Sequence, residues 1–371
     1  MANNAFMKKY EAGIDVVTAA KQRIVNAFAN GIPVYLNLSG GKDSVCLNHL
    51  VYQLVMSGKV DKSLLDVVFI DEEGIYPCIE RIVKNTRTQW LLAGVKFEWF
   101  AMQYKHFNCL NQLTQDESFI CFDETKKDVW IRQPPSFAIR KHPLLKEGKD
   151  SYQEFLRKYT NDGMCLTGIR VSESVQRRRI LSTSKNASRN LWHPIYDWTD
   201  SDVWKYIHDN RLDFPEAYLY MYQTGTARNK MRLSQFFSVD TVGSLVKMSQ
   251  YYPSLFDRIC RREPNAYMAM LYFDTELYRR KKKEKNKKED YEAYKAHVLK
   301  TLTNIEGQPL SQHKTLKSLK TFLMCFTAYF DDRAWKKAYQ ICTGGDPKQR
   351  ALRSLRMIIL QNRYQVRLKN E

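Results

Sequence analysis

The chain has 371 residues, which is longer than one ordinary domain, and its 44% hydrophobic content is enough for a substantial core. No run of 18 uncharged apolar residues occurs, which argues against a membrane span and a membrane partner. The first residues lack the apolar segment of a signal peptide, so a cytoplasmic location is expected. The formal net charge is +19, of which residues 251–371 carry +13. This basic region suggests an anionic partner, nucleic acid first, and is equally compatible with a merely well-solvated, highly charged surface.

Apolar spacing and charge together predict three parts. Residues 1–30 are expected to form an N-terminal helical segment. Residues 31–240 are expected to form an α/β domain, with a long insertion near 101–159 that is either a substrate lid or a packed structural segment. Residues 241–371 are expected to form a basic helical C-terminal domain.

The first motif joins a strand to a helix. The apolar run 34–38 predicts a buried strand, and apolar residues at helical spacing follow from Val45. Glycines in such a turn let the backbone approach an anion, and the helix N-terminus favours negative charge. Hydroxyl groups and a lysine add further donors. The loop therefore predicts a phosphate site built by Ser39, Gly40, Gly41, Lys42, Asp43 and Ser44.

Acidic residues follow the next predicted strand, 64–70. Asp71, Glu72 and Glu73 stand at its carboxyl end, where open α/β sheets bind ligands. Carboxylates there suit a Mg²⁺ ion beside nucleotide phosphates. We expect Asp43, Asp71 and Glu72 as its candidate ligands, and the sequence leaves open which of the three consecutive acids faces the nucleotide.

A second group of anion-binding residues follows the predicted strand 164–169. Gly168 lies at its end and Arg170 comes directly after, and arginine can hold phosphate oxygens with two parallel hydrogen bonds. Further along, Thr199 and Asp202 have the spacing of a helix-capping pair. His193 and Asp197, just before this pair, either contact substrate or bond locally.

These segments resemble a known family. Ser-Gly-Gly-Lys-Asp-Ser resembles the PP-loop of ATP pyrophosphatases, which cleave ATP between the α and β phosphates. The segments after residues 70 and 168 and the Pro-Ile-x-x-Trp-Thr-x-x-Asp-Val-Trp stretch resemble the phosphoadenosine phosphosulfate (PAPS) reductase branch of that superfamily. The overall layout is similar to its immunoglobulin-binding-regulator A type. In place of the family's Asp-Thr-Gly, this chain has Asp-Glu-Glu-Gly at 71–74.

The resemblance implies an adenine nucleotide alpha hydrolase-like fold, which is a doubly wound, mostly parallel α/β sheet, here with a basic helical region after it. It also implies ATP and Mg²⁺ as ligands, and Lys42, Asp43 and Arg170 as catalytic residues. The nucleotide-binding set it implies consists of the six loop residues from Ser39 to Ser44 together with Asp71, Gly168, Arg170, Glu173 and Arg177, and Ser174 is a further candidate.

The residues favour an enzyme of ATP α/β-phosphate chemistry whose acceptor is sulfate, a nucleic-acid base or another nucleophile. A nucleotide-sensing, nucleic-acid-binding regulator without turnover is the first alternative, and a protein partner remains open. PAPS reduction is the second alternative. It is disfavoured because the family's Glu-Cys-Gly-x-His motif is absent and a thiol needs an activating environment.

Overall fold

The structure is a computed structural model that describes residues 13–110, 118–173, 190–228, 231–233, 235–238, 241–272, 290–344, 346 and 350–370. It divides into two compact units. The first comprises Met1–His106 and Phe119–Pro264, and the second comprises Phe107–Ser118 and Asn265–Glu371.

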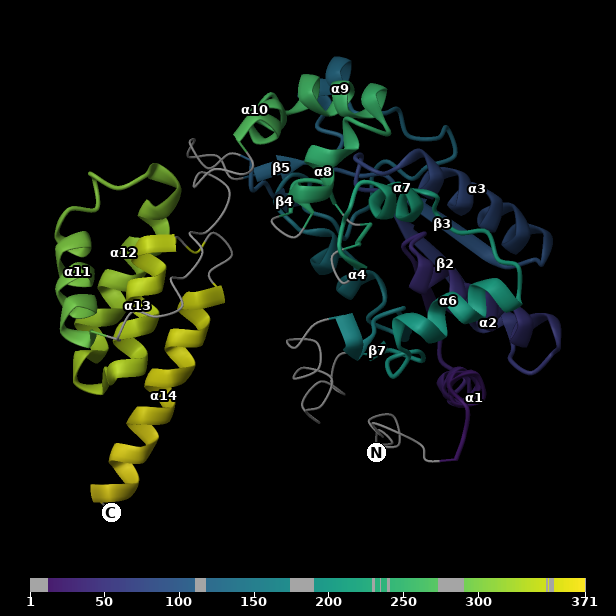
Figure 1. Cartoon of the computed structure of the whole chain (residues 1–371). Helices are drawn as coiled ribbons and strands as arrows, with labels where there is room; N and C mark the ends of the chain where they lie inside the picture. The colour runs from purple at the N-terminus through teal and green to yellow at the C-terminus, as the bar shows by residue number, and fades with distance from the viewer. Residues whose placement is uncertain are drawn as a thin grey trace. The chain divides into compact units, whose positions relative to one another are not determined.

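The first unit is built on a five-stranded sheet whose order is β3-β2-β1-β6-β7 (Figure 1). Each neighbouring pair is parallel. Chain order runs outward from β1 in one direction and then reverses at β6, so the β1/β6 boundary is the switch point where such sheets bind ligands. The parallel α/β sheet expected from the sequence is confirmed. The strands are Val34–Leu38 (β1), Leu65–Ile70 (β2), Lys96–Phe100 (β3), Met164–Leu166 (β6) and Leu191–Trp192 (β7).

The central strands are apolar because both faces of the sheet are covered. Val34, Leu36 and Leu38 of β1 are almost fully buried, and in the pairing register Val34 lies opposite Leu65 of β2. Strands that are buried on both faces read as continuous apolar runs and not as alternating patterns. This is why the run 34–38 was recognisable in the sequence.

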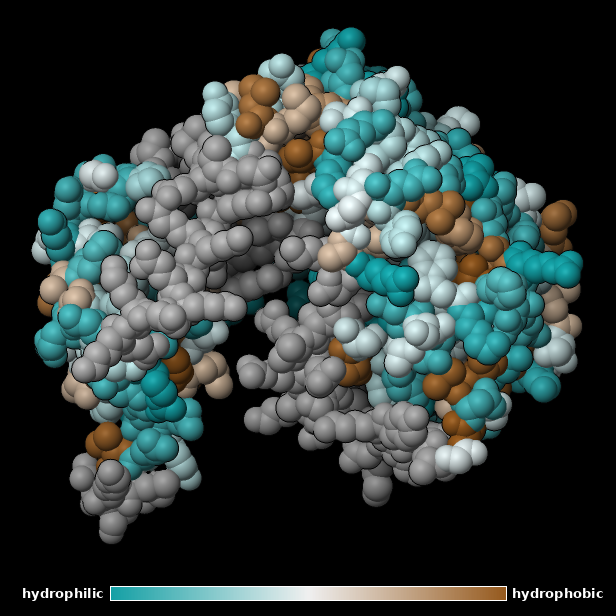
Figure 2. Space-filling view, viewed as in Figure 1, coloured by the Kyte–Doolittle hydropathy of each residue, from teal (hydrophilic) through white to brown (hydrophobic). Residues whose placement is uncertain are grey.

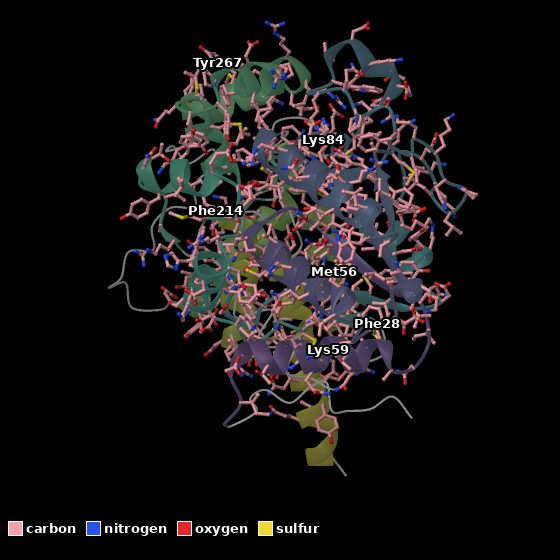
Figure 3. All side chains as sticks on the ribbon, turned by 90° about the vertical axis from the view of Figure 1, so that its right-hand side faces the viewer. Phe28, Met56, Lys59, Lys84, Phe214 and Tyr267 are labelled. Carbon is pink, nitrogen blue, oxygen red and sulfur yellow. The ribbon has the colours of Figure 1, made fainter. Side chains whose placement is uncertain are left out.

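Helix α6 of the first unit begins at the capping pair that the sequence predicts. Thr199 and Asp202 form a reciprocal capping box at the start of α6, as expected. Phe28 near the end of α1 is buried, whereas Met56 at the end of α2 is exposed (Figure 3). The helices are Val16–Phe28 (α1), Lys42–Met56 (α2), Pro77–Leu92 (α3), Tyr152–Tyr159 (α4), Asp200–Asp209 (α6), Ala217–Gln223 (α7), Val242–Met248 (α8) and Pro253–Arg262 (α9).

The first unit extends beyond the expected boundary at residue 240. Both α8 and α9 belong to it, and the division falls after Pro264. Leu255 and Ile259 of α9 are buried, and Arg262 forms an ion pair with Glu73 beyond β2. The composition changes near 240 because these helices carry basic residues, but their apolar faces pack on the α/β core.

The expected insertion is a packed segment where the structure describes it. It contains a two-stranded sheet of β4 (Lys105–Phe107) and β5 (Ser118–Ile120) and a 3-10 helix at Glu124–Val129. Trp130 is buried, and the neighbouring Arg132 forms an ion pair with Asp71. Of the two alternatives for this segment, the structural one agrees with these contacts.

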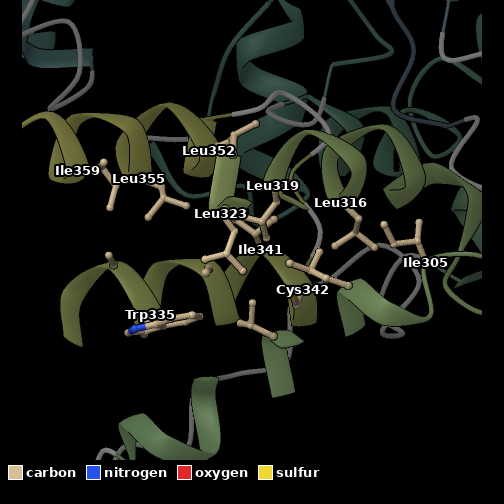
Figure 4. Close-up of a cluster of buried hydrophobic side chains, with 14 residues drawn as sticks. Ile305, Leu316, Leu319, Leu323, Trp335, Ile341, Cys342, Leu352, Leu355 and Ile359 are labelled. Atoms are coloured by element: carbon tan, nitrogen blue, oxygen red, sulfur yellow. The ribbon is translucent and has the colours of Figure 1, made fainter. Parts of the chain in front are cut away.

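The second unit contains a helical core of its own (Figure 4). Leu316, Leu319 and Leu323 lie on the buried stripe of α12, and Trp335 of α13 and Leu355 of α14 pack against the same cluster. Its helices are Asn265–Tyr272 (α10), Tyr291–Thr303 (α11), Leu310–Phe326 (α12), Asp332–Gly344 (α13) and Arg350–Asn370 (α14).

Hydrophobic residues are scattered among hydrophilic ones on the face of the first unit that Figure 2 shows. Isolated apolar residues of this kind are normal on a protein surface. In the part of the chain that the structure describes, no helix is both long and apolar enough to cross a membrane.

The buried Glu73–Arg262 pair generates a stability prediction. Replacing Arg262 by Met leaves the Glu73 carboxylate buried without its cation, which should lower the free energy of unfolding by about 3 to 5 kcal/mol. Arg261→Met is the matched control, because Arg261 is exposed and pairs with Asp257 on the surface, so its loss should cost about 0.5 kcal/mol or less. Urea unfolding followed by tryptophan fluorescence measures both. Equal losses of unfolding free energy in the two variants would contradict a stabilising role for the buried Glu73–Arg262 pair.

Candidate functional site

The loop between β1 and α2 has the backbone geometry of an anion site. Gly40 has φ of +73°, and a Cβ there would lie 2.8 Å from Ile79 Cγ2, so glycine is required on both counts. Gly41 is the N-cap of α2 and supplies no capping side chain. Ser44 Oγ donates to the Gly41 carbonyl (3.0 Å) and accepts from Ser39 N–H (3.3 Å), which holds the loop closed. No capping side chain consumes the first N–H groups of α2, although the Lys42 N–H donates to the Tyr218 hydroxyl at 3.4 Å.

The backbone that follows β6 passes close to the backbone of this loop. A Cβ at Gly168 would lie 3.1 Å from the Asp43 carbonyl carbon and the Ser44 nitrogen. A side chain here would push against the backbone of the first turn of α2. Gly168 thus allows β6 to bring the following Arg170 next to Asp43.

Two cations and two carboxylates meet beside the loop. Arg170, with a side chain 1% exposed, places Nε 2.6 Å from Asp43 Oδ1 and Nη2 2.7 Å from Asp200 Oδ1. Lys42 Nζ lies 3.2 Å from Asp43 Oδ2 and 3.6 Å from Asp200 Oδ1. It also lies 5.4 Å from the centre of the Tyr218 ring. Lys42, Asp43 and Arg170, which the sequence named as catalytic, are brought together by the fold.

The sequence analysis missed Asp200. It lies at the first position of α6, directly after the Thr199 cap, in a segment where the sequence predicts only the capping pair Thr199 and Asp202. Burial opposes ionisation of Asp200, but the hydrogen bond from Arg170 and the charge of Lys42 hold its pKa below the ordinary value. The stretch contains three acids, Asp197, Asp200 and Asp202, but the helix cap needs only Asp202. The additional acid is the sequence signal that could have pointed to Asp200.

The three consecutive acids after β2 have different surroundings. Asp71 is fully buried, accepts a hydrogen bond from Trp99 Nε1 (2.7 Å) and forms an ion pair with Arg132. Glu73 is also fully buried and is paired with Arg262 at 2.9 Å. Glu72, between them, lines the cavity described below. Of the three acids, Glu72 is therefore the one that lines the cavity, and Asp71 is engaged with Trp99 and Arg132.

Glu72 has a polar neighbour in His106. Its Oε1 lies 3.2 Å from His106 Nε2. Burial, with the nearby charge of Asp71, raises the pKa of Glu72 to about 8. Burial also lowers the pKa of His106 to about 4, so the imidazole is neutral at physiological pH. At neutral pH, Glu72 is therefore largely protonated and His106 is neutral, so the pair carries little charge.

The described residues do not assemble the expected Mg²⁺ ligand set. Among them, no group of three or more His, Cys, Asp or Glu side chains is placed to hold a metal ion. Asp43 is paired with Lys42 and Arg170, and Asp71 with Arg132. Glu72, the third expected ligand, takes part in neither of these ion pairs. A magnesium cage built from the described side chains does not fit this site.

A cavity of about 440 Å³ opens between these groups, within the range of small-molecule sites. Its polar wall comes from the loop, the end of β6 and the start of α6, and includes Ser39, Gly41, Lys42, Asp43, Ser44, Gly168, Arg170 and Asp200. Arg228 and Arg232 add two further cationic side chains to the lining. A second wall is largely apolar and includes Phe69, Ile70, Ile75, Ile79, Met231 and Leu233. The cavity suits a ligand with an anionic end and a flat apolar end.

Other candidates lie away from the cavity or outside the described residues. His193 Nδ1 lies 2.5 Å from Thr167 Oγ1, and both oxygens of Asp197 accept hydrogen bonds from Arg23. Neither contact is local in the sequence, because His193 and Thr167 are 26 positions apart and Asp197 and Arg23 are 174 apart, and neither His193 nor Asp197 lines the cavity. Glu173 ends a short 3-10 helix, and Arg177 and Ser174 lie outside the described residues.

None of the eight cysteines, all of which fall within the described ranges, lines the cavity. Burial raises the pKa of Cys260 to about 11 and that of Cys165 and Cys342 to about 12, and it raises the pKa of Cys46, Cys78 and Cys121 as well. Thiols in these surroundings are protonated and poorly nucleophilic. The described lining of the site therefore offers no activated cysteine.

A parallel sheet with a glycine-rich loop at its switch point defines a doubly wound α/β protein. The chain belongs to the phosphoadenosine phosphosulfate reductase domain family, whose model matches residues 33–260. The matched region begins one residue before β1 and ends within α9.

Two individual proteins are similar to the chain. The uncharacterized protein YbdN of Escherichia coli (strain K12) is 25% identical over 316 residues, which cover 78% of this chain and 76% of that protein. The structure of the U34-tRNA thiolase NcsA from Methanococcus maripaludis, with its 4Fe–4S cluster, matches 68% of this chain and 78% of its own, at 11% identity and a TM-score of 0.32. That likeness is too distant to transfer any property.

The raised pKa of Glu72 predicts a pH-dependent stability difference. Between pH 4.5 and about 8 the folded chain keeps a proton on Glu72 that the unfolded chain has lost, so stability falls as pH rises through this range. Glu72→Gln cannot ionise. Its free energy of unfolding should rise relative to the unmodified protein by about 1 kcal/mol per pH unit between pH 5.5 and 7.5. Urea unfolding at several pH values measures this, and parallel profiles would show that Glu72 is not held protonated.

Proposed function

We propose that the chain binds ATP in the cavity and cleaves it between the α and β phosphates, transferring adenylate to an acceptor. The observation that carries this proposal is the convergence of Lys42 and Arg170, from two different elements, on an uncapped helix N-terminus inside one cavity. Membership of the PAPS reductase domain family supports a nucleotide-using role.

Each residue has an electrostatic task in this reaction. A nucleophile of the acceptor attacks the α phosphorus, the bond to the bridging oxygen breaks, and pyrophosphate leaves with the bonding electron pair. The first N–H groups of α2 and the Lys42 ammonium stabilise the charge on the leaving pyrophosphate. Arg170 stabilises the charge that develops on the α phosphate. Asp43 keeps both cations in position.

The apolar wall gives the nucleoside its place. Phe69 and Ile70 end β2, Ile75 lies just before α3, and Ile79 lies in the first turn of α3. A purine ring against these side chains would direct its phosphate chain toward the glycine loop. Magnesium, for which the described side chains build no cage, would be held by the nucleotide phosphates.

The acceptor is sulfate, a nucleic-acid base or another nucleophile, including one in a sulfur-transfer reaction. Reduction of a sulfonucleotide by a thiol of this chain is disfavoured, because none of the eight described cysteines lines the cavity and burial raises the pKa of six of them.

A nucleotide-sensing, nucleic-acid-binding regulator is a second candidate, favoured by the charge distribution of the second unit. Residues 290–370 contain 15 basic and six acidic residues. Asp290, Asp331 and Asp346 accept hydrogen bonds from backbone N–H groups at helix starts. Because these acids serve as caps, the helix faces are left basic. Lys314, Lys317 and Lys320 form an exposed row along α12.

The decisive experiment for α/β cleavage follows the α phosphate. The protein is incubated with α-labelled ATP and Mg²⁺, alone or with sulfate, DNA or tRNA. We expect AMP or an adenylylated acceptor, with a loss of at least about 100-fold in Lys42→Ala, because the cation that stabilises the leaving group disappears.

Lys205→Ala is the matched control, since Lys205 is an exposed lysine on α6 paired with Asp209, and it should keep full activity. Release of ADP, or ATP binding without turnover under every condition, would contradict cleavage between the α and β phosphates. Either result would favour the nucleotide-sensing, nucleic-acid-binding regulator.

The row on α12 gives a prediction for the second candidate. Changing Lys314, Lys317 and Lys320 together to Gln should weaken DNA or RNA binding at low salt. It should also reduce the slope of log affinity against log salt by about 0.7 to 0.9 for each phosphate that the lysines no longer neutralise. Fluorescence anisotropy at several salt concentrations measures both quantities. An unchanged slope would exclude this row from the nucleic-acid-binding surface.

A further inference from the structure

The anion site is electrically balanced before any ligand binds. Lys42 and Arg170 supply two positive charges, and Asp43 and Asp200 supply two negative charges within 3.6 Å of them. A phosphate that approaches this group meets cations that already have carboxylate partners. The phosphate can bind these cations strongly only if one of the carboxylates moves away from them.

The two carboxylates differ in their freedom to move. Asp43 lies in the first turn of α2 with a side chain 16% exposed, and it contacts both cations. The Asp200 side chain is 54% exposed, and it pairs with Arg170 and Lys42. Asp200 can therefore rotate toward solvent, whereas Asp43 is enclosed.

The capping of α6 does not depend on the Asp200 side chain. The start of α6 is capped by Thr199 and Asp202, whose side chains and backbone N–H groups bond reciprocally. Rotation of Asp200 away from the cations leaves this capping box intact. The carboxylate is therefore free to act as a ligand of the two cations.

We infer that Asp200 is an internal counter-anion that occupies the phosphate site and is displaced by the incoming nucleotide, an inference that rests on the proposed function. The displacement selects for polyphosphates. A single inorganic phosphate or sulfate only exchanges one anion for another at Lys42 and Arg170. A triphosphate has further oxygens for the N–H groups at the start of α2, and these contacts offset the displacement of Asp200.

The test compares anion selectivity in Asp200→Asn with that of the unmodified protein. Titration calorimetry measures binding of inorganic phosphate, pyrophosphate and ATP, each with Mg²⁺. The variant should bind inorganic phosphate at least about tenfold more tightly, because its cations no longer have a competing carboxylate. Its ATP affinity should change much less, so the preference for ATP over phosphate narrows.

Asp209→Asn is the matched control. Asp209 is an exposed acid on the same helix, paired with Lys205, and its replacement changes the net charge equally. It should leave all three affinities unchanged. An equal gain in phosphate affinity in both variants would reduce the effect to overall charge and overturn the proposal.

Two further outcomes also overturn it. Weaker binding of every anion in Asp200→Asn would mean that Asp200 positions Arg170 instead of competing with the ligand. Unchanged binding, or no anion binding by either protein, would mean that Asp200 is not displaced. Since these readouts need no turnover, they stay separate from α/β cleavage: ATP binding with narrowed selectivity but no AMP would contradict only the proposed reaction.

Discussion

The buried guanidinium of Arg170 is the constraint on which the site depends. A cation with 1% exposure is tolerated only when carboxylates and carbonyls replace its lost water. Asp43 from α2 and Asp200 from α6 supply the charges, and the Trp198 carbonyl before α6 accepts a further hydrogen bond at 3.3 Å. Because the charge of Arg170 must be neutralised, its ion pairs hold the glycine loop, the end of β6 and the start of α6 together. The polar wall of the cavity is a consequence of that requirement.

The same principle operates on the other side of β1. Asp71 and Glu73 are buried and each is matched with an arginine, Arg132 or Arg262, from a distant part of the first unit. Glu73 also has φ of +64°, a conformation that a non-glycine residue adopts only when its surroundings hold it. With its neighbours anchored in opposite directions, Glu72 is the acid left to face the cavity. Its position is set by the ion pairs of the residues beside it.

These two arrangements show what the sequence could and could not predict. Strand β1, the loop at Ser39–Ser44 and the Thr199 cap were predictable because each depends on neighbours within a few positions. The choice of Glu72 over Asp71 depends on Arg132, 61 positions from Asp71, and the role of Asp200 depends on Arg170, 30 positions away. Long-range ion pairs leave no periodicity in the sequence. The boundary near 240 was misplaced for the same reason, since Glu73 and Arg262 are 189 positions apart.

Charge is organised differently in the two units, and the difference follows from where their acids lie. Beside the glycine loop, two carboxylates face Lys42 and Arg170, so this group of four side chains is balanced in formal charge, while Arg228 and Arg232 add positive charge to the cavity lining. In the second unit, Asp290, Asp331 and Asp346 satisfy backbone N–H groups at helix starts, and the exposed row on α12 sets three lysines against Glu306, which lies 3.9 Å from Lys317. A surface of that kind attracts polyanions over a Debye length with little selectivity. Attraction and selection of anionic ligands are therefore physically separable in this chain.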